Sequence, residues 1–507
     1  MTARRPLVQG TVIQASVNLY NRLLGIISQA LVIRVLGTEG YGLYQLSVPI
    51  FLLALVLATA GIPLAVTKVV AYEGSRGNFA GIRSIMRWSL IWLLLLGTVL
   101  SILLALLWPL LVRYWVFDPR AHWCILVLGL SLPVIATASA LRGYFQGIQR
   151  MEIPALAQMF EQSVRVGSGL YLEHLLLPFG ITWATAGYAA GVLLGELSGL
   201  LLLTFFYLKS SRRSGSSGLK SHPLSLTIPE KIAPFAAPAT LNRLLSAVVL
   251  NLEAAVVPRF LQATGYTREQ STGLYGQFMG VALTLVSIPS IATLAIGSNL
   301  LPAVAYARGH NDHEYLRRSI GQVLKLVFAF SLPFCVILWL VPQEITRILF
   351  GVNETVDYIR SLAVGGLGLY MIQVANSTLY GLGQPLRVLA NTFLYLSIRV
   401  FLIFFFMGRG GGLTALAWAY FASYLAGTAL NLNSLRQYLF PRRPPHLHTL
   451  ILGGIIMLLV TGTFKNMFYS QRAISFSSMA LLLGLSVGVY LLAVFLGELY
   501  LEKKRFR

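Results

Sequence analysis

Apolar runs of about 20 residues recur almost from one end of this 507-residue chain to the other. About 20 residues is the length that an α-helix needs to cross a bilayer core of about 30 Å. We count fourteen such runs, among them 43–70 and 273–303, separated by polar or Pro/Gly-containing segments. Outer-membrane barrels would instead alternate over about ten residues. The sequence therefore predicts an all-α polytopic membrane protein with about 14 transmembrane helices.

The basic residues indicate how the chain crosses the membrane. Of the 39 Lys and Arg residues, we place 25 on the same side of the spans as both termini, 10 on the opposite side and four inside spans. Because Lys and Arg accumulate in cytoplasmic loops, both termini are predicted to be cytoplasmic. The net charge of +22 is then a topology signal that favours contact with anionic membrane lipids, and no nucleic acid partner is needed to explain it.

The residue patterns of metal and nucleotide chemistry are missing from the sequence. Cys124 and Cys335 are the only cysteines, and both lie in apolar runs, so neither a disulfide framework nor a metal site is indicated. There is no GxxxxGK[ST] motif, which excludes a phosphate-binding loop of that type. We expect no catalytic residues, no metal and no cofactor, apart from a coupling cation or proton.

Two similar halves follow one another in the chain. Three pairs of matching segments recur at offsets of 231, 236 and 234 residues: 42–44 with 273–275, 143–147 with 379–383, and 163–166 with 397–400. A duplicated block of six spans explains this pattern. Because six is an even number, the two copies enter the membrane in the same direction, as parallel repeats.

The duplication and a segment rich in Ser, Gly and basic residues predict the domain organisation. We expect an N-terminal six-helix lobe at 1–208, a cytoplasmic basic linker at 209–231, a C-terminal six-helix lobe at 232–438, and two additional helices with a basic cytoplasmic tail at 439–507. Within the sixth span, four glycines at four-residue spacing predict close helix packing: Gly187, Gly191, Gly195 and Gly199.

Four arginines lie near the centre of predicted spans: Arg22, Arg165, Arg243 and Arg399. Counting from the span starts places them about 15–21 Å into a core of about 30 Å. A charge costs at least about 2.5–3.5 kcal/mol at that depth, so such residues normally face a water-filled cavity or a partner. We interpret the four as substrate-binding residues for an anion in a cavity between the lobes.

Three glutamates share these spans, and two interpretations of them remain open. Glu161, Glu196 and Glu253 either neutralise the arginines or bind a coupling cation or proton, because a buried carboxyl retains a proton readily. Glu161 and Arg165 are four residues apart, so they can pair on one helix face. Arg22 and Arg243 have no acidic residue at helical spacing.

The motifs together resemble one transporter superfamily. NRLLG at 21–25, VIRVLGTEGYGLYQ at 32–45, LRGYFQG at 141–147 and EQSVRV at 161–166 are similar to segments of the MOP exporter superfamily. The resemblance is greatest to its branch of polysaccharide and lipid II flippases, which includes sporulation proteins, and it covers essentially the whole chain. It implies a V-shaped cavity between two six-helix lobes, and two C-terminal helices whose groove suits a polyprenyl tail.

The resemblance also bears on the first span. In peptidoglycan precursor flippases this span typically reads RxLGxxRD, with arginines that are important for activity. Arg22 matches the first Arg of that pattern. Ser28 and Gln29 stand where the second Arg and the Asp would be, so this chain departs from the family's phosphate-binding set. Arg243 corresponds only to an arginine of the seventh span.

The function implied by the resemblance is that of a flippase in the bacterial cytoplasmic membrane. Its substrate would be an undecaprenyl-pyrophosphate-linked saccharide, a peptidoglycan precursor such as lipid II, for spore cortex or vegetative wall, moved by alternating access. Cell-wall synthesis proteins would be further partners. The alternatives are a translocator of another polyprenyl-linked polysaccharide unit, a cation-coupled multidrug exporter, a polytopic sugar-polymer transferase and a non-transporting scaffold. The predicted spans contain the four central arginines and three glutamates. This excess of positive charge argues against a protein that binds lipophilic cations.

Overall fold

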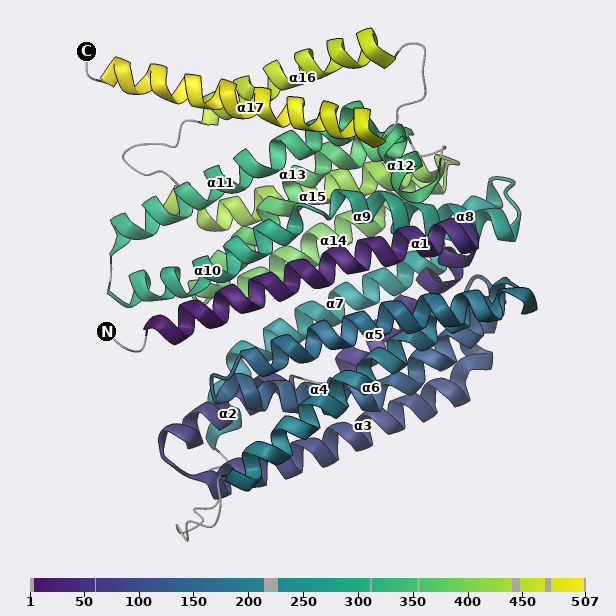
Figure 1. Cartoon of the computed structure of the whole chain (residues 1–507), viewed down its shortest axis with the longest axis vertical. Helices are drawn as coiled ribbons and strands as arrows, with labels where there is room; N and C mark the ends of the chain where they lie inside the picture. Colours follow the sequence, from purple (N-terminus) through teal and green to yellow (C-terminus); the bar gives the residue numbers. More distant parts are fainter. Residues whose placement is uncertain are drawn as a thin grey trace. The chain divides into compact units, whose positions relative to one another are not determined.

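The described parts of the chain fold almost entirely into α-helices (Figure 1). The computed structural model describes residues 4–59, 61–213, 227–310, 312–352, 356–439, 447–469 and 476–505. Within these ranges no strand is present. The prediction of an all-α polytopic fold is confirmed.

The first of two compact units comprises Met1–Gly280. Its helices are α1 (Arg4–Thr59), α2 (Ile62–Ser75), α3 (Phe79–Tyr114), α4 (His122–Gly147), α5 (Glu152–Leu176), α6 (Ile181–Arg213), α7 (Thr227–Ala263) and α8 (Arg268–Gln277), with 3-10 turns at Pro119–Ala121 and Leu177–Phe179. α7 and α8 both pack against α1, so this unit extends past the predicted linker. Residues 214–226 of that linker lie outside the described residues, and the predicted lobe boundaries stay a prediction.

The second unit comprises Val281–Arg507. Its helices are α9 (Leu283–Val286), α10 (Ser290–Gly309), α11 (His313–Leu340), α12 (Pro342–Phe350), α13 (Val356–Gly381), α14 (Pro385–Met407), α15 (Gly412–Leu439), α16 (Leu447–Tyr469) and α17 (Phe476–Arg505). α16 and α17 pack against each other and α16 lies along α11 (Figure 1). They are the two additional helices expected after the repeat.

Eleven helical segments of the described chain are long and apolar enough to cross a membrane. The first of them, Ser16–Ser75, contains two expected spans. Gly37, at φ 71°, is not helical, so α1 consists of two helices joined at a kink that precedes the expected run 43–70; such a backbone angle favours glycine. The expected run 43–70 is interrupted at Gly61, and 273–303 is divided among α8, a π-helical turn, α9 and α10. The count of fourteen spans remains a prediction.

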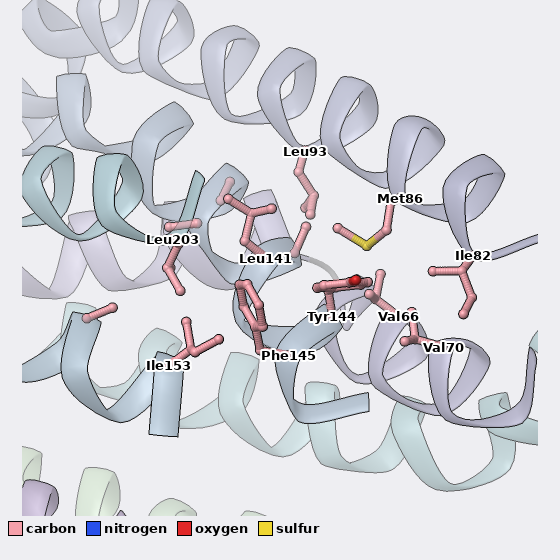
Figure 2. Packing of buried hydrophobic residues seen from close by; sticks show 14 of the residues in the cluster. Val66, Val70, Ile82, Met86, Leu93, Leu141, Tyr144, Phe145, Ile153 and Leu203 are labelled. Atoms are coloured by element: carbon pink, nitrogen blue, oxygen red, sulfur yellow. The ribbon is translucent and has the colours of Figure 1, made fainter. Parts of the chain in front are cut away.

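An apolar core holds α2 to α6 together (Figure 2). Its members include Val66 and Val70 of α2, Ile82, Met86 and Leu93 of α3, Leu141 and Phe145 of α4, Ile153 of α5 and Leu203 of α6. Because lipid tails are as apolar as leucine, burial alone does not bring helices together in a bilayer. Close contact between surfaces of complementary shape therefore has to supply much of the stability.

The glycine ridge of α6 provides one such contact. A Cβ atom at Gly191 would lie 2.5 Å from Gly169 Cα and 2.6 Å from the Arg165 carbonyl oxygen of α5. A Cβ atom at Gly195 would lie 2.7 Å from the Glu161 carbonyl oxygen. The predicted packing role of these glycines is confirmed, since α5 and α6 meet backbone to backbone.

We expect Gly191→Leu to destabilise the protein. The added side chain must push α5 and α6 apart, and overpacking of this kind typically costs about 1–3 kcal/mol. Thermal unfolding in detergent measures the change. Gly167→Leu is the matched control, because nothing lies within 4 Å of a Cβ atom at that exposed position of α5. Equal unfolding temperatures for the two variants would contradict the packing role.

Candidate functional site

Two arginines and two glutamates form a closed ion-pair network in the first unit. Arg165 Nη2 lies 2.7 Å from Glu161 Oε1 and 2.6 Å from Glu196 Oε1. Arg142 Nη2 lies 2.6 Å from Glu161 Oε2 and 3.2 Å from Glu196 Oε2. Each carboxylate therefore contacts both guanidinium groups, and the four formal charges cancel.

Three helices position this network. Arg142 lies near the end of α4, Glu161 and Arg165 one turn apart on α5, and Glu196 on α6. The side chains of Glu161 and Glu196 are only 11% and 6% exposed. Their approach depends on the α6 ridge, because a Cβ atom at Gly199 would lie 3.2 Å from Glu161 Oε2.

The network favours one of the two interpretations left open by the sequence. The expected pairing of Glu161 with Arg165 is present, and Glu196 joins it. Sequence reasoning missed Arg142, because it stands near the end of its apolar run, away from the centre of the span. Its place in the segment LRGYFQG at 141–147, one of those that carry the family resemblance, was the available signal. A substrate role for Arg165 stays a prediction.

Arg22 lies on the part of α1 that packs against α5. The arginine is half-buried. Two residues before it, Tyr20 OH lies 2.8 Å from Ser163 Oγ. The preceding residue, Asn21, has a buried Oδ1 atom that accepts no hydrogen bond from the described part of the chain. This carbonyl oxygen is an unused acceptor next to a candidate anion-binding residue.

Arg243 occupies the corresponding position of α7. It is exposed, and its preceding residue, Asn242, also has a buried Oδ1 atom without a hydrogen bond to the residues described. The two NRLL segments at 21–24 and 242–245 therefore share an unsatisfied asparagine acceptor as well as an arginine. Native structures contain few such groups, and each calls for an explanation such as a ligand or water.

Arg399 has a different environment from Arg165, its repeat counterpart. It lies on α14 in the second unit, 8% exposed, and its Cζ atom lies 4.3 Å from the ring centroid of Tyr420 on α15. A guanidinium group over an aromatic face is stabilised by the ring quadrupole. The structure thus pairs one repeat arginine with carboxylates and places the other on a tyrosine ring.

The residues that replace the family pattern on α1 have structural contacts. Ser28 Oγ lies 3.3 Å from Tyr188 OH of α6, and Gln29 Nε2 donates to the carbonyl oxygen of Gly280. Both contacts connect α1 to other parts of the first unit. Ser28 and Gln29 therefore have packing roles in place of the charged groups that the pattern would supply.

Buried carboxyls of the first unit also lie on α5 and α7, outside the ion-pair network. Glu253 of α7 is 2% exposed. Glu173 of α5 is 1% exposed, and neither of its carboxyl oxygens has a hydrogen-bond partner within the described ranges. Sequence reasoning did not select Glu173, which stands near the end of the expected span 153–177. An acidic residue inside an apolar run was the signal that could have found it.

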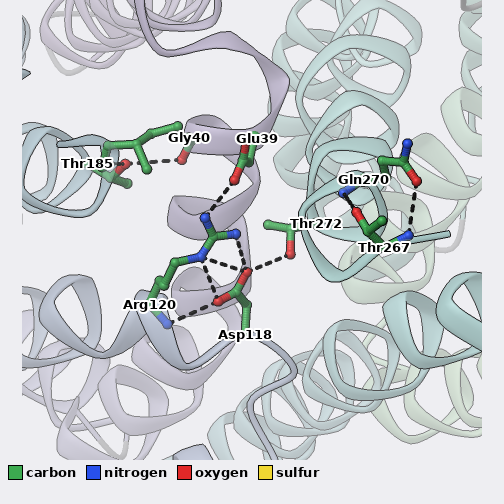
Figure 3. A network of polar contacts seen from close by, with 9 residues as sticks. Glu39, Gly40, Asp118, Arg120, Thr185, Thr267, Gln270 and Thr272 are labelled. Carbon is green, nitrogen blue, oxygen red and sulfur yellow. Dashed lines mark hydrogen bonds and ion pairs between the residues drawn. The ribbon is translucent and has the colours of Figure 1, made fainter.

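A second polar network joins α1, the turn before α4, and α8 (Figure 3). Arg120 Nη2 lies 2.7 Å from Asp118 Oδ2, and its Nη1 lies 2.7 Å from Glu39 Oε1. Asp118 Oδ2 also accepts a hydrogen bond of 3.0 Å from Thr272 Oγ1 on α8. Since Asp118 is fully buried, these bonds compensate its desolvation and fix α8 to the bend of α1.

Family models match most of the chain. One described as "Polysaccharide biosynthesis protein" matches residues 7–308, and one described as "MatE" matches residues 278–405. Stage V sporulation protein B of Bacillus subtilis (strain 168) is 28% identical over 406 residues, which cover 79% of this chain and 78% of that protein. Lipid II flippase MurJ of the same organism is 24% identical over 350 residues, covering 64% of this chain and 63% of that protein.

Solved structures share the fold at lower sequence identity. The lipid II flippase MurJ in its inward closed conformation has a TM-score of 0.70 at 14% identity, covering 98% of this chain and all of that chain. An inward-facing multidrug resistance MATE family transporter of the MOP superfamily has a TM-score of 0.64 at 15% identity, covering 84% of this chain and 98% of that chain. Together with its apolar helices, the family models and the sequence relatives identify the chain as a multi-pass membrane transporter of this superfamily. It belongs to the polysaccharide biosynthesis protein family, whose model matches more than half of its length.

We expect Glu196→Gln to lower the stability of the first unit. Removing one carboxylate leaves two guanidinium groups sharing Glu161, and breaking a buried ion pair typically costs about 3–5 kcal/mol. The partial exposure of Arg165, at 30%, favours the lower end of that range. Denaturant or thermal unfolding measures the loss. The control is Glu152→Gln, which removes the carboxylate of the exposed pair with Arg150. We expect it to lower the free energy of unfolding by less than about 1 kcal/mol. A similar loss in both variants would contradict a stabilising network.

Proposed function

We propose that this transporter flips an undecaprenyl-pyrophosphate-linked saccharide, a peptidoglycan precursor such as lipid II, across the bacterial cytoplasmic membrane by alternating access. The observation that carries the proposal is the repeated Asn-Arg pair of α1 and α7. Each pair joins an arginine near the middle of an expected span to a buried asparagine oxygen that no described residue satisfies.

The two groups of each pair suit the two parts of such a headgroup. A guanidinium group binds phosphate oxygens through parallel N–H donors, so Arg22 and Arg243 would hold the pyrophosphate. The Oδ1 atoms of Asn21 and Asn242 can only accept hydrogen bonds, and sugar hydroxyls would supply the donors. Arg165 and Arg399 would contribute less to anion binding, because carboxylates neutralise the first and a tyrosine ring covers the second.

The relatives support a lipid-linked substrate of the cell wall. The name of one relative specifies lipid II, and that of another specifies sporulation, so a precursor of the spore cortex fits both. The apolar exposure of α17 suits a polyprenyl tail: Leu481 is 67%, Leu491 60% and Phe495 60% exposed. The basic loops indicate that both termini lie in the cytoplasm. The polyprenyl tail would stay in lipid while the headgroup crosses the membrane.

The charge of the substrate makes its export energetically favourable. With the cell interior negative, moving negative charge outward releases about 2.3 kcal/mol per charge per 100 mV. Transport could therefore run on the membrane potential alone. Among the candidate coupling groups, Glu161 and Glu196 are engaged by two arginines, so Glu253 is the better candidate for a coupling cation or proton.

We expect the double variant Arg22→Ala/Arg243→Ala to lose at least about tenfold in flipping rate. Each arginine supplies charged hydrogen bonds worth about 1.5–3 kcal/mol, and a tenfold change corresponds to about 1.4 kcal/mol. The measurement is lipid II translocation in proteoliposomes with an imposed inside-negative potential. Arg387→Ala, an exposed arginine at the start of α14, is the matched control.

Two further measurements make this result specific. Unfolding temperatures of the double variant and the control separate loss of function from loss of folding. Turnover of a second polyprenyl-linked sugar distinguishes lipid II from another saccharide unit. A double variant that folds normally and flips lipid II at the full rate would show that the proposed site is wrong.

A further inference from the structure

A pocket of about 450 Å³ in the first unit lies where α3 ends and α8 begins. It is distant in sequence from the candidate site at Arg22. Its polar lining consists of Arg113 from α3, Arg259 and Gln262 from α7, and Arg268 from α8, and the remaining lining residues include Val116 and Phe117. None of its lining residues is acidic. The pocket therefore presents three cations and an amide to whatever enters it.

Backbone contacts fix the central arginine of the pocket. Arg259 Nη1 donates to the Trp115 carbonyl oxygen at 3.1 Å, and its Nη2 to that of Tyr114 at 3.3 Å. Arg113 lies with its Cζ atom 5.3 Å from the Tyr114 ring centroid. Carbonyl and ring contacts orient these guanidinium groups without neutralising them. Among the residues described, neither they nor Arg268 form an ion pair with a carboxylate.

Two acidic residues stand close to the pocket in sequence, and their charges decide its sign. Asp118 shares Arg120 with Glu39, each at 2.7 Å, so this group carries one net negative charge. The pKa of Glu269 is lowered by its own backbone N–H and by the Thr267 hydroxyl, so this exposed carboxyl is ionised at neutral pH. Two negative charges in all against the three positive charges of the pocket still leave its surroundings positive.

Aromatic residues place this end of the unit at the membrane surface. Tyr114 and Trp115 are 64% and 40% exposed. Nearby in the chain, Trp123 stacks on Trp183 with a centroid distance of 4.9 Å, and both are exposed. Exposed Trp and Tyr residues concentrate at the depth of lipid headgroups. These residues therefore indicate that the pocket lies at the depth of lipid phosphate groups.

We propose that this pocket binds the phosphate group of a membrane lipid. Several guanidinium groups without carboxylate partners are the chemistry that recognises phosphate, and the apolar wall of Val116 and Phe117 suits the adjoining glycerol or isoprenoid carbons. On the topology proposed above, the pocket faces the outer leaflet. Two lipids carry the required group there: a phosphatidylglycerol of the bilayer, or a polyprenyl pyrophosphate, the latter resting on the proposed function.

The test compares binding by the purified full-length chain in detergent. The probes are dioctanoyl phosphatidylglycerol, a short-chain polyprenyl pyrophosphate and inorganic pyrophosphate, and native mass spectrometry or ligand-dependent thermal shifts give the affinities. The variant Arg113→Gln/Arg268→Gln leaves the backbone-bonded Arg259 in place. We expect it to weaken binding of at least one lipid probe about tenfold or more, because charged hydrogen bonds to phosphate are lost.

Two matched variants separate charge from folding. Arg409→Gln removes an exposed arginine that also lies over an aromatic ring, that of Phe405, and should leave every affinity within about twofold. Glu269→Gln should strengthen lipid binding, since it removes the negative charge beside Arg268. A merely structural role of this region would not produce opposite effects for the two kinds of substitution.

The outcomes distinguish the sources of the phosphate. Weakened binding of phosphatidylglycerol alone identifies a bilayer-lipid site, and weakened binding of the polyprenyl pyrophosphate alone identifies a substrate-lipid site. Unchanged affinity for both lipids, or a loss seen with inorganic pyrophosphate alone, would overturn the proposal. Lipid binding at this pocket should persist in the variant Arg22→Ala/Arg243→Ala. A failure of the pocket proposal is therefore distinguishable from a failure of the proposed transport site.

Discussion

Neutralising charge inside an apolar helix bundle is the constraint on which the first unit depends. The network of Arg142, Glu161, Arg165 and Glu196 requires α5 and α6 to be close enough for single side chains to reach across. That distance is available only because the α6 glycines lie against the α5 backbone. The small-residue ridge and the ion pairs are therefore one feature, since a larger side chain on α6 would separate the carboxylates from their partners.

Local features of this arrangement can be predicted from the sequence. Features that depend on packing between distant segments cannot. Apolar runs identify the helices, and four-residue spacing identifies the Glu161–Arg165 pair, because both follow from the geometry of one helix. Arg142 was missed, since its partners come from helices whose packing no local pattern specifies. The division between the first two spans is a local feature as well: the run expected from residue 43 follows a kink at Gly37, where the backbone leaves the helical region.

Repeat-related arginines occupy matching positions in their spans, but their surroundings differ. Arg165 and Arg399 are matched by the repeat, yet carboxylates bind the first and Tyr420 packs against the second. A sequence repeat conveys that a guanidinium group recurs at one position of a span. It does not convey what lies opposite, since that is set by residues elsewhere in each half. Equal roles for repeat-related arginines therefore cannot be inferred from their alignment alone.

The different environments of these arginines limit the positions in the first unit at which an anion can be stabilised. A guanidinium group matched by carboxylates adds no net positive charge, so Arg142 and Arg165 cannot supply the attraction that a pyrophosphate needs. The repeated Asn-Arg pairs differ, because an asparagine with an unsatisfied oxygen gains a hydrogen bond only when a donor enters. Sugar hydroxyls of a bound headgroup would donate to these oxygens, while the adjacent arginines would bind its phosphates. This complementarity is a physical reason to place the headgroup along α1 and α7, away from the ion-pair network.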